Sequence, residues 1–366
     1  MIEATGLSVV RAWSSGLEDV VAAATRLSSV DGDAGILRIA GVGLEDVVDR
    51  GFTGVTAALL ARAATDDDVI GTDDAIGTAR YRAERARLDS AAFVEARWLR
   101  HDPMTTLRFA LCALDGDDPA SFVAAAHVTL AAWLRAHGHT GVGIDDVDDT
   151  ASAGAFILAR GVGDTDEAAG LALDRYLTTV IDHGMNASTF TARVVASTRA
   201  SLSSSLTAAL GALSGPLHGG APGPVLDLLD AIDVGGVAVI ERELDAGRRL
   251  MGFGHRVYRV RDPRAAVLEA TVDTLLKDAP PARRERLQRA RSLEATATAA
   301  LSRRHPDRPL PANVEFFTAV LLEALGLPRE AFSAIFAAGR ISGWCAHVIE
   351  QRRTGKLIRP ASIEAR

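Results

Sequence analysis

Residues 251–264 read MGFGHRVYRVRDPR, which joins a glycine-flanked histidine to the start of a helix. Asp262 offers a side-chain oxygen to the free N–H groups of a first turn, and Pro263 suits the first helical position. Apolar residues follow at helical intervals at Ala266, Val267, Ala270, Val272 and Leu275. The stretch therefore predicts a turn that a ligand can approach closely, leading directly into a helix.

The same helix signals recur along the chain. An apolar run opens at Asp118-Pro119 and closes at Gly138, and another opens at Pro328. Residues 282–304 are rich in Arg and Glu, which is typical of a helix with one solvated face. These segments predict that most of the chain is helical.

The composition agrees with a helical fold. Hydrophobic residues make up 48% of the chain and aromatic residues only 5%, and Ala and Leu dominate the apolar set. Such side chains favour close-packed helices over sheets. Only two short stretches, 36–42 and 234–240, carry the β-branched residues typical of strands. We therefore expect an all-α protein.

The charge and the termini exclude several classes of function. The net charge is −7, which argues against the broad basic surface of a nucleic-acid binder but allows a few arginines to converge on an anion. Residues 1–11 lack the basic start and apolar run of a signal peptide, and no uninterrupted apolar run is long enough to span a bilayer. We expect a cytoplasmic protein with neither nucleic acid nor membrane as partner.

The two cysteines, Cys112 and Cys345, lie in apolar helical runs. We expect both thiols to be buried, because this number and placement suit neither a disulfide scaffold nor a zinc site.

Two breaks rich in glycine and proline divide the chain. Residues 214–224 hold four glycines and three prolines, and residues 305–311 hold three prolines. They predict a large helical domain made of residues 1–218 and 326–366, with a small helical domain, residues 219–325, inserted in it.

Chemistry is concentrated in three short segments. His218 lies in SGPLHGGA (214–221), His255 follows Gly254, and Glu315 lies in PANVEFF (311–317). A carboxylate base together with imidazole hydrogen-bond donors is sufficient to enolise a substrate. Each segment alone has a plainer interpretation, as a turn histidine or a carboxylate at a helix start.

Taken together and in this order, the segments resemble the citrate synthase family. Residues 182–190, DHGMNASTF, look like its His-containing Asn-Ala-Ser motif, and residues 256–264 match its His-to-Arg spacing. Residues 339–360 match its C-terminal signature. The resemblance implies the citrate synthase-like fold.

The resemblance also implies an acyl-CoA condensing enzyme. Glu315 stands where the family has its catalytic base and would take a proton from the methyl group of acetyl-CoA. His218 would stabilise the resulting enolate at the thioester oxygen, and His255 would polarise the keto group of oxaloacetate. Hydrolysis of the citryl-CoA thioester would follow, with no metal and no tightly bound cofactor, because imidazole donors replace a Lewis acid.

Oxaloacetate carries two carboxylates, which planar and always charged guanidinium groups bind well. By resemblance Arg264, Arg340 and Arg359 are its carboxylate ligands, and His183 is a further ligand. Arg264 also lies in a first helical turn, where the helix dipole favours an anion, although a surface position is the commoner fate of an arginine. The family's last arginine reaches the neighbouring subunit's site, which implies a homodimer.

CoA enters as the thioester substrate. Arg259 matches a family ligand for its phosphates, and the turn from Gly252 to Gly254 would offer backbone contacts to the nucleotide. Arg256 and Arg261 remain alternative phosphate ligands.

Two departures from the family keep other functions open. Glu315 replaces the usual Asp, and a base misplaced by about 1 Å costs on the order of a hundredfold in rate. Glu364 stands in place of a Tyr near the C-terminus. The alternatives are a 2-methylcitrate synthase that uses propionyl-CoA, since one methylene is worth only about 1–3 kcal/mol, and a divergent binding protein without catalysis. A plain helical scaffold would leave the glycine-flanked histidines unexplained.

Overall fold

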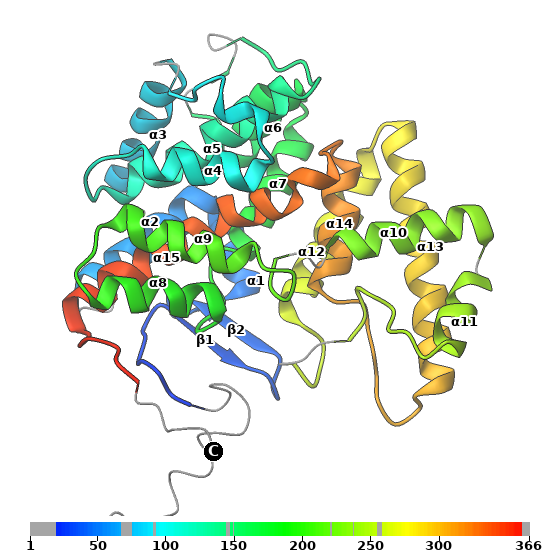
Figure 1. The fold of residues 1–366 in the computed structure, drawn as a ribbon. Coiled ribbons are helices and arrows are strands. Elements are labelled where there is room, and N and C mark those ends of the chain that lie inside the picture. The colour runs from blue at the N-terminus through cyan, green and yellow to red at the C-terminus, as the bar shows by residue number, and fades with distance from the viewer. Residues whose placement is uncertain are drawn as a thin grey trace, which may run out of the picture.

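The computed structural model describes residues 20–66, 75–90, 93–143, 147–148, 150–219, 222–236, 238–254 and 258–360. Helices dominate this part of the chain, which confirms the all-α prediction (Figure 1). In chain order they are α1 (Leu44–Val47), α2 (Gly51–Ala64), α3 (Ala75–Ser90), α4 (Pro103–Cys112), α5 (Pro119–Ala136), α6 (Ala153–Val162), α7 (Glu167–Thr179), α8 (Ala187–Ser197), α9 (Leu202–Leu213), α10 (Pro222–Gly235), α11 (Ala238–Asp245), α12 (Pro263–Asp278), α13 (Pro281–Arg304), α14 (Val314–Ala324) and α15 (Phe332–Thr354).

The helix starts that the sequence predicts are confirmed. The Asp262 side chain accepts a hydrogen bond from the N–H of Arg264, and α12 begins at Pro263. The Asp118 side chain caps α5 in the same way at the N–H of Ala120. After Pro328, a short 3₁₀ turn over Arg329–Ala331 precedes α15.

A small antiparallel sheet precedes the helices. Strands β1 (Ser28–Asp31), β2 (Ile36–Ile39) and β3 (Val42–Gly43) pair in the order β1-β2-β3, so the prediction of a strand within 36–42 is confirmed. The strand signal at 234–240 is wrong, because Val234 belongs to α10 and Ile240 to α11. Both Val239 and Ile240 are buried in the helical core, which accounts for their apolar character.

The two thiols differ in exposure. Cys345 is fully buried, as predicted, but Cys112 is exposed at the end of α4, so the prediction for Cys112 is wrong. Its Sγ atom lies 3.5 Å from Thr207 Oγ1 on α9. Cys112 therefore lies on the outer side of the α4–α9 contact, whereas Met104, Leu107 and Leu111 of α4 are buried.

Helix α15 forms the centre of the molecule. It packs against α2, α5, α8 and α9 and runs among them in Figure 1. The segment Arg329–Thr354 is long and apolar enough to cross a membrane by composition, yet 83% of its most apolar window is buried inside the protein. Such burial is what the core helix of a packed helical fold shows.

Helix α12 lies between two groups of helices. It packs against α7 on one side and α14 on the other. Helices α10, α11, α13 and α14 lie together, away from α3, α4, α5 and α6 (Figure 1). This arrangement places the first turn of α12, with Arg264, where the groups meet. The division into domains 1–218 with 326–366, and 219–325, stays a prediction.

Candidate active site

Arg264 is oriented by the residue that caps its own helix. Its Nε donates to Asp262 Oδ1 at 3.1 Å and its Nη2 donates to Asp262 Oδ2 at 2.8 Å. Arg264 is 7% exposed, so this fork is nearly dry. The same carboxylate thus starts α12 and fixes the plane of the guanidinium, which is how a two-pronged anion ligand is held ready.

Arg340 is a buried cation on α15. Its Nε donates to the carbonyl of Val180 at 2.6 Å, and its guanidinium lies 4.8 Å from the ring centre of Phe336. Within the described residues, no carboxylate lies at ion-pair distance from it. Burial lowers the pKa of Arg340 to about 10, although the charge of Asp182 opposes this shift. A guanidinium so placed favours the arrival of an anion, because burying an unpaired charge is costly.

Glu315 lies in the first turn of α14. The Asn313 side chain caps this helix by accepting hydrogen bonds from the N–H groups of Glu315 and Phe316. Part of Glu315 is exposed, but its Oε2 atom is buried and finds no hydrogen-bond partner among the described residues. Burial raises the pKa of Glu315, and the charge of Arg264 works against that rise. A carboxylate in this environment is a stronger base than one in water.

His218 follows α9 and faces Ser188 of α8. Its Nε2 lies 2.9 Å from Ser188 Oγ, which also accepts a hydrogen bond from Trp344 Nε1 at 3.3 Å. Burial lowers the pKa of His218, and the positive charge of Arg340 lowers it further. The ring is therefore held neutral near pH 7, so that it can act as a hydrogen-bond donor and keep no charge of its own.

His183 contacts the segment that leads into α12. Its Nε2 lies 2.9 Å from the hydroxyl of Tyr258, with the two rings edge to face. Tyr258 is 4% exposed, and the charge of Arg264 acts on its hydroxyl. His183 thus belongs to the same neighbourhood as Arg264.

The charges of these residues act on one another. Arg264 acts on both Glu315 and Arg340, and Arg340 acts on His218. The structure therefore brings His183, His218, Arg264, Glu315 and Arg340 into one cluster. They come from segments that are far apart in the sequence. The cluster combines a carboxylate, two imidazoles and two guanidinium groups.

The remaining predicted residues lie elsewhere or cannot be placed. His255 lies outside the described residues, as does the alternative phosphate ligand Arg256. Arg359 is exposed and lines a different cavity, of about 530 Å³, together with Phe190 and Gln351. The structure does not bring Arg359 to Arg340 within one subunit.

The predicted CoA segment borders a separate cavity of about 520 Å³. Gly254, Arg259, Arg308 and Asn313 are among its lining residues. The Arg259 guanidinium lies 2.9 Å from Asp33, but both side chains are more than 80% exposed, so water screens this pair. Arg259 is therefore available to a ligand.

Gly252 and Gly254 fix the turn beside that cavity. Both have positive φ, 87° and 74°, which only glycine adopts at low cost. The N–H of Gly254 donates to Pro311 O at 2.8 Å, and the N–H of Asn313 donates to Gly252 O at 2.9 Å. These bonds attach the turn to the segment that carries Glu315.

Sequence reasoning missed Ser188 and Tyr258 as partners of the two histidines. Both residues lie in segments that it singled out, 182–190 and 251–258, so motif membership was the available signal. In the described part of the chain, no three His, Cys, Asp or Glu side chains are grouped to hold a metal ion.

Comparisons with known proteins identify the relatives of the chain. The family model described as "Citrate synthase, C-terminal domain" matches residues 16–361. "Putative citrate synthase 2" of Mycobacterium tuberculosis is 39% identical over 95% of this chain and 91% of its own length. A 2-methylcitrate synthase of Shewanella oneidensis is 34% identical over 63% of this chain and 60% of its own. The crystal structure of citrate synthase from Thermotoga maritima superposes with a TM-score of 0.78 at 28% identity, covering 95% of this chain and 94% of that one.

Proposed function

This chain belongs to the citrate synthase family and is a citrate synthase-type acyltransferase, and we propose that it condenses acetyl-CoA with oxaloacetate to give citrate and CoA. The observation that carries this proposal is the buried guanidinium of Arg340, without a carboxylate partner among the described residues, in one cluster with Arg264, Glu315 and His218. A dicarboxylate supplies the missing negative charge.

The first step is proton transfer from acetyl-CoA. Glu315 takes a proton from the methyl carbon, and the electron pair moves onto the thioester oxygen. Its buried, unpartnered Oε2 supports this role, since no internal hydrogen bond must break first. His218 stabilises the enolate by donating a hydrogen bond to the thioester oxygen. Ser188 Oγ, 2.9 Å from Nε2 of His218, orients the imidazole ring.

The second step forms the carbon–carbon bond. The enolate carbon attacks the keto carbon of oxaloacetate, and the C=O electron pair moves onto the oxygen that His255 polarises. This oxygen takes up one proton, the number that Glu315 removed, so citryl-CoA forms without a net change in protons. Arg264, Arg340 and His183 hold the carboxylates, so the keto group has one orientation. Water then cleaves the thioester and releases CoA.

CoA binds at the cavity between Gly254 and Asn313. Arg259 contacts its phosphates, and the turn at Gly252 and Gly254 offers backbone groups to the nucleotide. The hydrogen bonds from this turn to Pro311 and Asn313 support the assignment, because they join the cavity to the base at Glu315. CoA is a substrate here, and we propose no tightly bound cofactor.

The protein acts as a cytoplasmic homodimer in which Arg359 serves the partner's site. Support comes from the position of Arg359, which is exposed and apart from Arg340.

The chain length of the acyl substrate has a second candidate. The relationship to a 2-methylcitrate synthase favours propionyl-CoA as the alternative. Release of free thiol from each acyl-CoA in the presence of oxaloacetate ranks the two, and we expect the higher kcat/KM with acetyl-CoA. A higher value with propionyl-CoA would reassign the substrate. Calorimetric binding of oxaloacetate without thiol release from either would favour the binding protein.

A further inference from the structure

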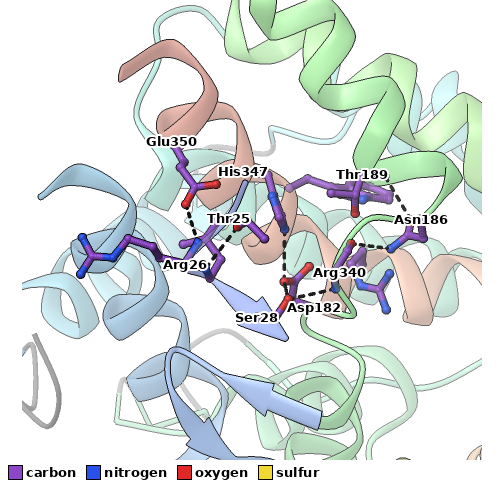
Figure 2. Close-up of polar contacts among 12 residues, drawn as sticks. Thr25, Arg26, Ser28, Asp182, Asn186, Thr189, Arg340, His347 and Glu350 are labelled. Carbon is purple, nitrogen blue, oxygen red and sulfur yellow. Dashed lines mark hydrogen bonds and ion pairs between the residues drawn. The ribbon is translucent and has the colours of Figure 1, made fainter. Parts of the chain in front are cut away.

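We propose that His347 is a positioning residue for oxaloacetate binding, acting through Asp182 on the segment that carries His183. The proposal rests on the proposed function, since it assigns His183 and Arg340 to the oxaloacetate site. It concerns a buried polar network that no catalytic step uses (Figure 2).

Asp182 holds the backbone on both sides of His183. Its Oδ2 accepts a hydrogen bond from Ser28 Oγ at 2.5 Å, and Ser28 Oγ accepts one from the N–H of Gly184 at 2.9 Å. Figure 2 shows this cluster beside Arg340. Asp182 and Gly184 flank His183, so a shift of the carboxylate moves the imidazole. Asp182 is 0% exposed, which leaves protein groups alone to fix it.

His347 supplies the second hydrogen bond to this carboxylate. Its Nε2 lies 3.2 Å from Asp182 Oδ2, and its Nδ1 lies 2.9 Å from Nη1 of Arg193. A guanidinium can only donate, so Nδ1 accepts and Nε2 carries the proton that faces Asp182. Arg193 therefore sets the tautomer that lets His347 donate.

Arg193 is itself held by further hydrogen bonds. Its Nη1 also donates to Glu350 Oε2 at 2.6 Å, and its Nε donates to Gln351 Oε1 at 2.9 Å. The side chains of Arg193 and Glu350 are 2% and 4% exposed, so this ion pair is dry. Each hydrogen bond in the chain Glu350–Arg193–His347–Asp182 consequently has a single direction: Arg193 donates to Glu350 and to His347, and His347 donates to Asp182.

The consequence for binding follows from Arg340. The charge of Asp182 acts on this guanidinium, and Asp182 Oδ1 has no hydrogen-bond partner among the described residues. Without the donor from His347, the carboxylate is held only by Ser28 and turns toward Arg340. It then competes with a carboxylate of oxaloacetate and displaces His183. The expected defect is specific to oxaloacetate.

The test compares His347→Gln with His347→Leu. A Gln amide can donate to Asp182 and accept from Arg193, whereas Leu can do neither. Calorimetry with oxaloacetate should give a Kd raised about tenfold or more by Leu and within about threefold of wild type for Gln. In thiol-release assays Leu should raise the KM for oxaloacetate by the same factor and change kcat less than threefold. Arg353→Gln, on the exposed side of the same helix, is the matched control and should bind as wild type does.

Three results overturn the proposal. They are a Kd for oxaloacetate that is equal in His347→Leu and wild type, a loss of affinity that is equal in His347→Leu and His347→Gln, or a fall in kcat with no change in Kd. If the Leu variant does not fold, Ser28→Ala carries the test, because it releases Asp182 on the other side; an unchanged Kd there also overturns it. Failure of the proposed function gives a different result, because wild type itself would then not bind oxaloacetate.

Discussion

The carboxylate at Glu315 is one methylene longer than the aspartate usual in the family, and the structure shows how it is accommodated. The Asn313 side chain caps the start of α14. The Oε2 atom of Glu315 is buried, and the positive charge of Arg264 acts on the Glu315 carboxylate. In the proposed mechanism, a shorter side chain at this position would withdraw the base from the methyl carbon of acetyl-CoA.

Substitution of Glu315 should therefore affect turnover far more than binding. We expect Glu315→Gln to lower kcat by about 10²–10⁴-fold, because the amide cannot accept the proton, and Glu315→Asp to lower it by about a hundredfold through misplacement. Thiol release measures both, and calorimetry should show oxaloacetate bound within threefold of wild type. A Gln variant with wild-type kcat would remove Glu315 from the mechanism.

The pH dependence follows from the direction of the same pKa shift. Burial raises the pKa of Glu315 above its ordinary value of 4.5, and the base works only when ionised. Activity should consequently fall as the pH drops through the raised pKa, so the acid limb of kcat/KM lies above 4.5. Glu315→Asp should retain an acid limb. If the limb lies at or below 4.5, Glu315 does not govern it.

Some site residues could be predicted from the sequence and their partners could not. Motif likeness led to Arg264, Glu315, His218 and His183 as candidates, and the place of Arg264 in a first helical turn was a second reason for choosing it. Ser188 lies 30 residues from His218, and Tyr258 lies 75 residues from His183, so their pairing depends on how distant segments pack. Asp182 and His347 are 165 residues apart, so their contact could not be predicted from the sequence for the same reason.

At the scale of elements, local signals succeeded where a helix start carries its own cap. The starts of α5 and α12 were predictable because Asp and Pro act within one turn. Strand β1 carries no such signal, since its residues Ser28–Asp31 pair with β2 only in the folded chain. The strand prediction for residues 234–240 was wrong because a short apolar run in a helix and a short strand look alike in sequence.

The two Asp caps provide a matched pair of substitutions. Asp118→Ala should lower the free energy of unfolding by about 0.5–2 kcal/mol, because it removes an N-cap. Asp262→Ala should lower it by about 3–5 kcal/mol, because it also breaks the buried ion pair with Arg264. Denaturant titration measures both. Only Asp262→Ala should also weaken oxaloacetate binding, by about tenfold, since Arg264 loses its fork. Equal oxaloacetate affinity in the two variants would show that Asp262 does not support oxaloacetate binding through Arg264.

At the scale of the whole molecule, the site is assembled from helices that meet around α12 and α15. Helix α12 packs against both α7 and α14, so its first turn lies where the two groups of helices join. A ligand held there by Arg264 and Arg340 would be bound by residues of both α12 and α15. We expect the small helical domain to close over oxaloacetate, with the breaks at 214–224 and 305–311 as hinges.

Closure should be visible in solution. We expect small-angle scattering to show a smaller radius of gyration on addition of oxaloacetate, because the ligand's charges pull the two groups together. Arg340→Gln should abolish the change at the same oxaloacetate concentration, since it removes the buried charge. An unchanged radius for the wild type, at a concentration that calorimetry shows to be saturating, would rule out closure.

The proposed reaction makes a carbon–carbon bond between an acetyl group and oxaloacetate at this cluster. The direct measurement is NMR of the product formed from oxaloacetate and acetyl-CoA labelled with ¹³C at the methyl carbon, with wild type beside Glu315→Gln and His218→Ala. We expect label in a methylene carbon of citrate from the wild type and at least a hundredfold less from either variant. A wild-type protein that binds both substrates and leaves the label in acetyl-CoA or free acetate would contradict it.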